Sequence, residues 1–235
     1  MTDLKNNFLY IIPCRGGSQR VKNKNFKKFG RSNLTQIAID TILGSNESKE
    51  NIIISSDSYI AKEIAMKNEV FYHKRSKNLS SNDAKTNGLV KDLFENFDIL
   101  NKYKYIVLIQ PTSPLRDTLD IRKSRELIIN ENKNSLITIT KCTFSNPDYL
   151  YELSDGKLKK IIEDFRCLKY NSEKLFFRNG AIYITHTNYF LKKNDLIDPN
   201  SLCFYKMPLV RSINIDTHDD WEIAEEIYNS KNKIL

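Results

Sequence analysis

The first group of residues able to do chemistry is a glycine-containing, basic loop near the start of the chain. It follows the apolar run Phe8 to Ile12 and Pro13, and it reads Arg15-Gly16-Gly17-Ser18 with further cations at Arg20, Lys22 and Lys24. Two adjacent glycines allow a sharp turn that brings backbone N–H groups close to a ligand, and fixed cations on the same loop attract an anion. After a first strand, such a loop favours polyphosphate binding.

The same pattern also fits a surface turn followed by a solvated basic run, because Gly-Gly is common at turns. The loop has neither the GxxxxGK[ST] spacing of a P-loop nor the GxGxxG spacing of a dinucleotide-binding fold. The local residues alone therefore leave both interpretations open.

Two further polar groups follow apolar runs that are typical of buried strands. Asp57 comes after the run 51–56, and the segment Gln110 to Arg116 comes after the run 105–109. Ligand sites of α/β proteins gather at the carboxyl ends of strands, but Asp57 also suits the N-cap of a following helix, which we favour. Two prolines stiffen the Gln110 to Arg116 segment, so it is either a rigid substrate loop or only a rigid connection.

Apolar periodicity places these loops in an α/β fold. Strands are predicted at 8–12, 51–56, 70–72, 105–109, 135–140, 179–184 and 201–210, and helices at 34–43, 58–67, 89–97, 118–130 and around 221–228. Thr118 is expected to cap the fourth of these helices, and Thr217 to Asp220 fit a capping box before the last one. Their alternation predicts a Rossmann-like three-layer fold with a mainly parallel central sheet. Aromatic and charged residues mix from Lys141 to Arg178, with a hairpin turn expected at Asp155-Gly156. We interpret residues 141–178 as an arm inserted into a single domain covering residues 1–235.

Composition narrows the classes of partner. With 40% hydrophobic residues the 235-residue chain can build one core, and no apolar stretch approaches the roughly 20 residues of a membrane span. The formal charge of +8 is spread along the chain, which favours small anionic substrates over nucleic acid. The four scattered cysteines form no metal or disulfide pattern, and the N-terminus has no leader pattern. We therefore expect a cytoplasmic protein with no membrane partner.

Four segments together resemble the acylneuraminate cytidylyltransferases, bacterial enzymes that make CMP-activated sialic acids and related nine-carbon sugar acids. They are IIPCRGGSQRVKNKN from Ile11, LIQPTSPLR from Leu108, NGAIYI from Asn179 and NIDTHDDWEIAE from Asn214, in the family's order. The resemblance implies a nucleotidyltransferase fold, cytidylyl transfer from CTP to a nonulosonic acid, a Mg²⁺ cofactor and a homodimer held by the 141–178 arm. Such a transfer needs positioning and charge neutralisation more than covalent chemistry, which suits a chain with no nucleophilic triad.

Residue by residue, the resemblance also assigns a site. Arg15, Lys24 and Asp216 match catalytic positions, and Asp216 with Asn214 would bind Mg²⁺, which prefers carboxylate and phosphate oxygens. The implied nucleotide-binding residues are Arg15, Gly16, Gly17, Ser18, Lys24, Asn25, Arg75 and Thr86. The implied sugar-binding residues are Gln110, Lys169, Arg178 and Asn179. Without the resemblance, Asp216 suits equally well the stabilisation of the N-terminus of the last helix.

Several positions depart from the family pattern. Asn214 stands where an aspartate is usual, Gln19 where lysine is common, and Lys169 and Phe177 where a sialic-acid enzyme often has arginines. Sialic and legionaminic acids remain the favoured substrates, with pseudaminic and octulosonic acids as alternatives. The missing carboxylate at Asn214 also leaves open a non-catalytic nucleotide-binding homologue.

Overall fold

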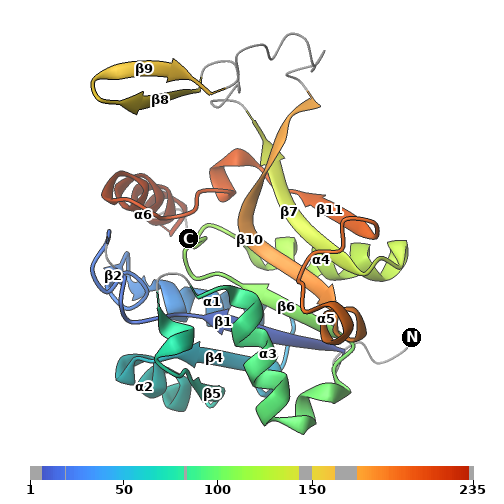
Figure 1. The fold of residues 1–235 in the computed structure, drawn as a ribbon. Helices are drawn as coiled ribbons and strands as arrows, with labels where there is room; N and C mark the ends of the chain where they lie inside the picture. The colour runs from blue at the N-terminus through green and yellow to red at the C-terminus, as the bar shows by residue number, and fades with distance from the viewer. Residues whose placement is uncertain (1–6, 19, 82–83, 143–149, 162–173, 233–235) are drawn as a thin grey trace.

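The computed structural model describes residues 7–18, 20–81, 84–142, 150–161 and 174–232 (Figure 1). Its centre is a seven-stranded sheet in the order β11-β7-β10-β6-β1-β4-β5. The strands are β1 (Phe8–Pro13), β4 (Ile52–Ser56), β5 (Phe71–Lys74), β6 (Tyr105–Ile109), β7 (Ser135–Lys141), β10 (Phe176–His186) and β11 (Leu202–Lys206). Neighbouring strands pair in parallel except for β10, which is antiparallel to β6 and β7. The predicted mainly parallel α/β sheet is confirmed.

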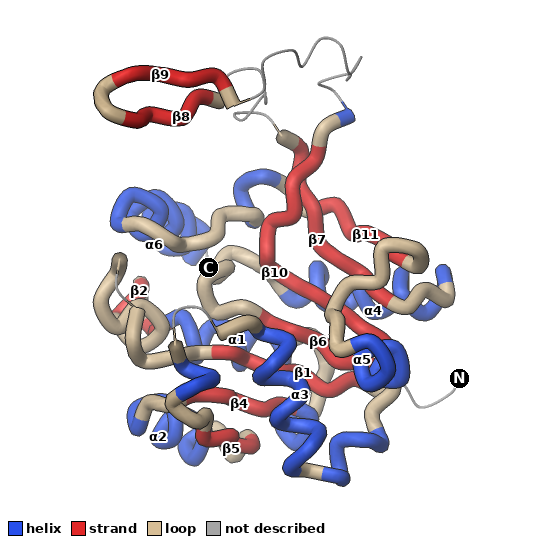
Figure 2. The backbone as a smooth tube through the Cα atoms, viewed as in Figure 1, coloured by secondary structure: helices blue, strands red, loops and turns tan. Residues whose placement is uncertain are grey.

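Helices cover both faces of this sheet (Figure 2). They are α1 (Leu34–Gly44), α2 (Tyr59–Lys67), α3 (Thr86–Asn96), α4 (Thr118–Glu131), α5 (Thr187–Lys193) and α6 (His218–Asn232). Tyr10 and Ile12 of β1 pack in one core with α1, α2 and α4, whereas Leu9 and Ile11 pack in a second core with α3 and α5. The strand β1 is thus buried on both faces, as its continuous apolar run predicts. None of the described helices is both long enough and apolar enough to span a bilayer.

A third, smaller cluster ties the last helix to the N-terminal region. Phe29, in the short pair β2 (Lys28–Phe29) and β3 (Ser32–Asn33), lies edge-on to Trp221 of α6 with ring centroids 5.1 Å apart. Ile215, just before α6, is buried in the same cluster, and its N–H donates to the Thr112 carbonyl at 2.7 Å. This packing brings the segment before α6 next to the loops that follow β1 and β6.

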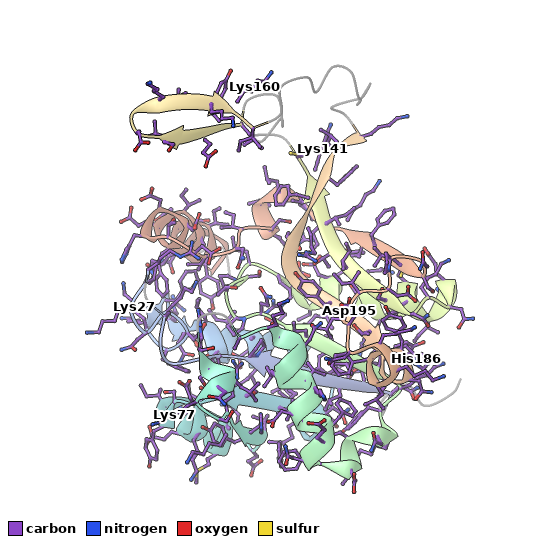
Figure 3. The ribbon with its side chains drawn as sticks, viewed as in Figure 1. Lys27, Lys77, Lys141, Lys160, His186 and Asp195 are labelled. Atoms are coloured by element: carbon purple, nitrogen blue, oxygen red, sulfur yellow. The ribbon has the colours of Figure 1, made fainter. Side chains whose placement is uncertain are left out.

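The stretch predicted to be an arm extends away from the core. Beyond the ends of β7 and β10 lies a hairpin of β8 (Tyr151–Ser154) and β9 (Lys157–Lys160); in Figure 3 the label Lys160 marks this hairpin and the label Lys141 marks the end of β7. Asp155 and Gly156 have positive φ angles of 50° and 73°, so the predicted hairpin turn is confirmed. Every residue of the hairpin is exposed except Lys160, which is half-buried.

Several element boundaries differ from those predicted, and two of the differences have a clear physical cause. Helix α4 is capped by Asp117 and not by Thr118, because the Asp117 carboxylate accepts two N–H groups of the first turn. The strand predicted for 201–210 ends at Lys206, since Pro208 has no N–H to donate to a ladder.

Candidate active site

A cavity of about 520 Å³ lies at the carboxyl ends of β1, β5 and β6, the edge of an α/β sheet where ligand sites gather. Six of the eight residues predicted to bind the nucleotide line it, namely Arg15, Ser18, Lys24, Asn25, Arg75 and Thr86. Arg20, Gln110 and Asp216 line it as well. Gly16 and Gly17 belong to the same loop but lie outside this lining. We call this space the cationic cavity.

Asp57 anchors the glycine loop by a hydrogen bond to its backbone. The Gly16 N–H donates to Asp57 Oδ1 at 2.8 Å, so this N–H is not free for a phosphate, contrary to the sequence-based expectation. The N-cap position of α2 is Ser58, so the favoured interpretation of Asp57 as the helix cap is also wrong. A contact across 41 residues of sequence explains both differences.

Further hydrogen bonds fix the rest of the loop after β1. Asn25 is buried, and its Nδ2 donates to the Arg15 carbonyl at 3.0 Å. The Lys24 N–H donates to Ser18 Oγ at 2.9 Å. The Arg15 guanidinium reaches across the cavity and donates to the Ser81 carbonyl at 2.9 Å. Asn25 and Ser18 therefore shape the loop, while the cationic ends of Arg15 and Lys24 reach the cavity.

A charge cluster joins this loop to the segment before α6. Lys24 Nζ donates to the Ile215 carbonyl and lies 3.4 Å from Asp216 Oδ1. Arg20 Nη2 lies 3.5 Å from the same carboxylate oxygen. The side chain of Lys24 is only 11% exposed, and this burial lowers the pKa of its ammonium group, while the Asp216 carboxylate raises it. The cluster carries an excess of positive charge, which suits an anionic ligand.

Arg75 and Thr86 line the cationic cavity from the β5 and α3 side of the fold. The Arg75 N–H donates to the Ser56 carbonyl at 2.9 Å, which continues the β4–β5 pairing by one residue. Burial lowers the pKa of the Arg75 guanidinium, because its charge is largely withdrawn from water. Thr86 is the first residue of α3, so its position adds the partial positive charge of a helix N-terminus to the cavity.

A second cavity of about 570 Å³ adjoins the first. Its lining mixes polar and apolar side chains and includes Phe177, Arg178, Asn179, Gly180, Tyr183, Asn214 and Asp220. Gln110 lines both cavities. We call the second space the mixed cavity.

Gly180 leaves room for the Gln110 amide. Its φ is +76°, and a Cβ built there would lie 3.2 Å from Gln110 Oε1. Both observations favour glycine at this position, because a side chain is strained at positive φ and its Cβ would displace the Gln110 amide slightly.

The predicted sugar-binding residues differ in how free their side chains are. Asn179 is 3% exposed, its Oδ1 accepts from Thr138 Oγ1 at 2.6 Å, and its Nδ2 donates to Ser212 Oγ at 2.9 Å. Its amide is therefore engaged at both ends and shapes the cavity wall. Arg178 is exposed, with its guanidinium carbon 5.6 Å from the centre of the Tyr183 ring. Lys169 lies outside the described residues.

Arg116 is a positioning residue to which the sequence analysis gave no role. It is 3% exposed, and its Nη1 donates to the carbonyls of both Gln110 and Ala181 at 3.0 Å. It thus links the loop after β6 to strand β10, between which the mixed cavity begins. Burial lowers the pKa of the Arg116 guanidinium to about 10. Its position at the end of the proline-stiffened loop is the sequence signal that could have identified it.

The two predicted metal ligands line different cavities. Asp216 lines the cationic cavity, whereas Asn214 lines the mixed cavity with a buried Oδ1 that has no hydrogen-bond partner among the described residues. Asp220 is occupied, because its Oδ2 accepts the N–H groups of Asp216 and Thr217 at 2.9 and 2.8 Å. With the return bond from the Asp220 N–H to Thr217 Oγ1, the predicted capping box is confirmed.

A divalent cation would therefore find one carboxylate in the cationic cavity. No group of three or more His, Cys, Asp or Glu side chains within the described ranges is arranged to hold a metal by itself. Mg²⁺ commonly takes only one or two carboxylates and completes its shell with substrate phosphates and water. The half-exposed Asp216 carboxylate fits such a site once a polyphosphate is bound.

Comparison with known proteins adds a family to this geometry. A family model described as cytidylyltransferase matches residues 9–203. The chain is 30% identical over 230 residues to the post-translational flagellin modification protein B of Campylobacter coli, a match covering 95% of this chain and 96% of that protein. It is 25% identical over 214 residues to an N-acylneuraminate cytidylyltransferase of Streptococcus agalactiae, covering 90% of this chain. The chain spans only about half the length of that enzyme, 51%.

Other similar proteins carry different substrate names. A pseudaminic acid cytidylyltransferase of Campylobacter jejuni and a CMP-N,N'-diacetyllegionaminic acid synthase of Legionella pneumophila are both 26% identical, over 94% and 97% of this chain and 95% and 98% of theirs. A solved structure of a CMP:2-keto-3-deoxy-manno-octonic acid synthetase complexed with CTP has a TM-score of 0.70, covering 95% of this chain and 99% of that one. At 10% identity this likeness concerns the fold alone, and it confirms the expected nucleotidyltransferase fold.

Proposed function

The chain belongs to the cytidylyltransferase family, and we propose that it transfers CMP from CTP to a nonulosonic acid with release of pyrophosphate. The observation that carries the proposal is that a cationic cavity and a mixed cavity meet at Gln110. Nucleotidyl transfer requires the reacting atoms of two substrates to approach to roughly 3–3.5 Å, which adjoining cavities of unlike chemistry allow. The sugar hydroxyl oxygen bonds to the α-phosphorus and releases its proton to water, while the bond breaks between that phosphorus and the oxygen that links it to the β-phosphate, which leaves with the pyrophosphate.

The triphosphate occupies the cationic cavity. Arg15, Arg20 and Lys24 surround the space with positive charge, which offsets the charge of the phosphates and of the leaving pyrophosphate. Lys24 is the best placed of these, because it is held to the Ile215 carbonyl and little of it is exposed. Arg75 and Thr86, which line the same cavity, bind the cytidine end.

The acceptor sugar occupies the mixed cavity. Gln110 can both donate and accept hydrogen bonds, which suits a polyhydroxylated acid, and Arg178 supplies a cation for the carboxylate. Asn179 stabilises the wall of the mixed cavity, since both ends of its amide have hydrogen-bond partners within the protein. We reassign Asn214 from the metal to the acceptor, because its unpartnered Oδ1 belongs to this cavity.

Asp216 is the proposed protein ligand of Mg²⁺. When bound, Mg²⁺ supplies positive charge that neutralises phosphate oxygens and the departing pyrophosphate. Asp216 would hold it with one carboxylate oxygen, while Lys24 and Arg20 keep that carboxylate oriented at 3.4 and 3.5 Å. The remaining ligands come from the phosphates and water.

The preferred acceptor is a nonulosonic acid of the sialic or legionaminic type. The name of the Legionella relative supports the legionaminic form, and that of the Campylobacter jejuni relative keeps pseudaminic acid as the alternative. Phe177 lines the mixed cavity where an arginine is common in sialic-acid enzymes, so this end of the site favours an apolar substituent. Octulosonic acid is a weaker alternative, suggested by the name of the structural neighbour.

A cytoplasmic homodimer is the proposed form of the protein, with no nucleic-acid or membrane partner. The hairpin β8–β9 supports the dimer, because Leu153 and Leu158 face each other across it and are 70% and 68% exposed. An isolated two-stranded hairpin is marginally stable in water, so a second copy that covers this apolar pair would stabilise both arms.

The test is pyrophosphate release from CTP and Mg²⁺ against a panel of purified nonulosonic and octulosonic acids. We expect release with one nine-carbon acid and little with the eight-carbon acid. CTP binding without release on any acid of the panel would instead favour the non-catalytic homologue. Replacement of CTP by UTP is the matched nucleotide control, and equal rates with both would contradict the cytidylyl assignment.

A further inference from the structure

A chain of hydrogen bonds lies behind the guanidinium of Arg75. Arg75 Nε donates to Ser55 Oγ at 3.1 Å, Ser55 Oγ lies 2.9 Å from His73 Nδ1, and His73 Nε2 lies 2.9 Å from Asp92 Oδ2. Ser55 belongs to β4, His73 to β5 and Asp92 to α3, so the chain crosses three elements. Ser55 is fully buried and His73 is 5% exposed, so water has little access to replace these bonds.

The two ends of this hydrogen-bond chain fix the direction of its first and last bonds, and the middle bond depends on the protonation of His73. An arginine Nε–H only donates, so Ser55 Oγ accepts from Arg75 and has its own hydrogen to give. His73 Nδ1 is the acceptor that the structure places within reach of that hydrogen, and it accepts only when it is unprotonated. A protonated Nδ1 would instead donate to the second lone pair of Ser55 Oγ and leave the hydroxyl hydrogen without an acceptor among the described residues. A neutral ring with a free Nδ1 carries its proton on Nε2 and donates it to the carboxylate of Asp92. The arrangement is therefore complete only when His73 is neutral.

The chain ends at a group that faces the nucleotide. Arg75 lines the cationic cavity, and its Nη2 is buried with no hydrogen-bond partner among the described residues. A buried guanidinium nitrogen without an acceptor is costly, and a ligand atom in the cavity would satisfy it. Ser55 thus fixes the Nε edge of the group and leaves the other edge for the ligand.

We propose that Ser55, His73 and Asp92 are positioning residues that hold Arg75 for CTP, and that CTP binding weakens when His73 becomes protonated. This rests on the proposed function, in which Arg75 binds the cytidine end. A protonated His73 donates from both nitrogens, so the Ser55 hydroxyl loses its acceptor. It also places a second positive charge two hydrogen bonds away from Arg75, on the other side of Ser55.

The surroundings of His73 determine the pH at which its ring becomes protonated. Asp92 from α3 and Arg75 beyond β5 are the charged groups that act on it, and the ring of Phe97 packs edge-on at 6.0 Å. Burial lowers the pKa of His73 from its ordinary value of 6.5, while Asp92 opposes that shift. The hydrogen-bond chain from Asp92 to Arg75 is therefore complete at neutral pH and is disrupted on acidification.

The first test is a double-mutant cycle on CTP affinity by calorimetry at neutral pH. We expect Arg75→Ala to raise the Kd for CTP roughly ten- to hundredfold and Ser55→Ala roughly two- to tenfold. The double variant should match Arg75→Ala, because Ser55 acts only through Arg75. Ser56→Ala is the matched control, since Ser56 is an equally buried serine of the same strand whose hydroxyl accepts from Ser58 and does not contact Arg75.

The second test is the pH dependence of the same Kd, which a merely structural role would not move. Ionisation of the CTP phosphates affects all variants alike, so the difference in Kd between the wild type and Arg75→Ala isolates the effect of His73 protonation. We expect that difference to shrink as the pH falls below about 6.5. Asp92→Asn, at a partly exposed position, should move the midpoint to lower pH, because removal of the carboxylate charge favours the neutral ring.

The outcomes separate this proposal from the proposed function. If Arg75→Ala weakens CTP binding while Ser55→Ala binds like Ser56→Ala, the positioning chain is wrong and the nucleotide site stands. A Ser55→Ala effect that persists in the Arg75→Ala background also overturns the chain. If Arg75→Ala binds CTP as the wild type does, or the wild type does not bind CTP, the assignment of Arg75 fails and the chain falls with it.

Discussion

Asp216→Asn distinguishes a metal ligand from a helix-terminal residue, because it removes one charge and keeps the size of the side chain. In the structure this carboxylate lies 3.4 Å from Lys24 Nζ and 3.5 Å from Arg20 Nη2. A metal ligand and a structural ion-pair partner predict very different sizes of effect on rate and on stability.

The structural contribution is small. At 3.4 Å a pair of unit charges interacts by about 1.2 kcal/mol in water and about 5 kcal/mol at an effective dielectric constant of 20. Asp216 is 48% exposed and Arg20 is 71% exposed, so the lower figure applies, and Lys24 keeps the Ile215 carbonyl as an acceptor. We expect Asp216→Asn to lower the stability by about 1 kcal/mol, or the melting temperature by roughly 2–4 °C.

The catalytic effect is expected to be much larger. Asp216 is the carboxylate that lines the cationic cavity among the described residues, so its loss removes the charged protein ligand of Mg²⁺. Metal-assisted charge stabilisation contributes several kcal/mol, so turnover should fall by at least about a hundredfold and need more Mg²⁺.

The assay is pyrophosphate release across a series of Mg²⁺ concentrations, with thermal melts on the same preparations. Asp219→Asn is the control, because it removes the same charge from the first turn of α6 at an exposed residue outside both cavities. An Asp216→Asn variant that melts a few degrees lower but keeps the wild-type rate and Mg²⁺ response would refute the metal assignment.

Three further outcomes are expected. Gly180→Ala should lower the melting temperature by roughly 2–8 °C, because a Cβ at φ +76° costs about 1–2 kcal/mol. It should also displace Gln110 and so raise the KM for the acceptor more than the KM for CTP, which steady-state kinetics with each substrate varied will show. The free energy of unfolding should be full above about pH 6.5 and fall below it, because burial lowers the pKa of His73 in the folded state and the unfolded chain therefore takes up the proton first. Urea unfolding at pH 7.5 and 5.5 measures this, and the loss of stability between the two pH values should be smaller in His73→Gln. Leu153→Asp combined with Leu158→Asp should convert the proposed dimer into a monomer, as measured by light scattering, and a wild-type protein that is already a fully active monomer would contradict the role of the arm.

The placement of the cationic cavity was predictable from sequence because it depends on local signals. The apolar run of β1 is buried on both faces, and Pro13 ends the strand where the glycine loop begins. The run 105–109 places Gln110 at the same edge of the sheet, since parallel strands expose their carboxyl ends together. Pattern and topology thus bring Gln110 and Arg15 to one cavity without knowledge of any side-chain contact.

Side-chain partners far apart in sequence were not predictable. Asn179 was expected to contact the sugar, but its amide pairs with Thr138 and Ser212, 41 and 33 residues away. The resemblance to the family implied that Asn214 and Asp216 bind one metal. In the structure the segment that carries them belongs to no strand, and the two side chains line different cavities.

Arg116 shows why the two cavities keep a fixed relation to each other. Its Nε and Nη2 are buried without partners among the described residues, so as a stability element it is poor and an apolar residue would serve better. What it contributes is geometry, because one nitrogen donates to both the Gln110 and the Ala181 carbonyls. Gln110 stands where the cavities meet, and Ala181 follows the glycine that gives the Gln110 amide its room. A reaction that needs its two substrates aligned within a few tenths of an ångström gains from such a link, which explains why a cation is kept in the core.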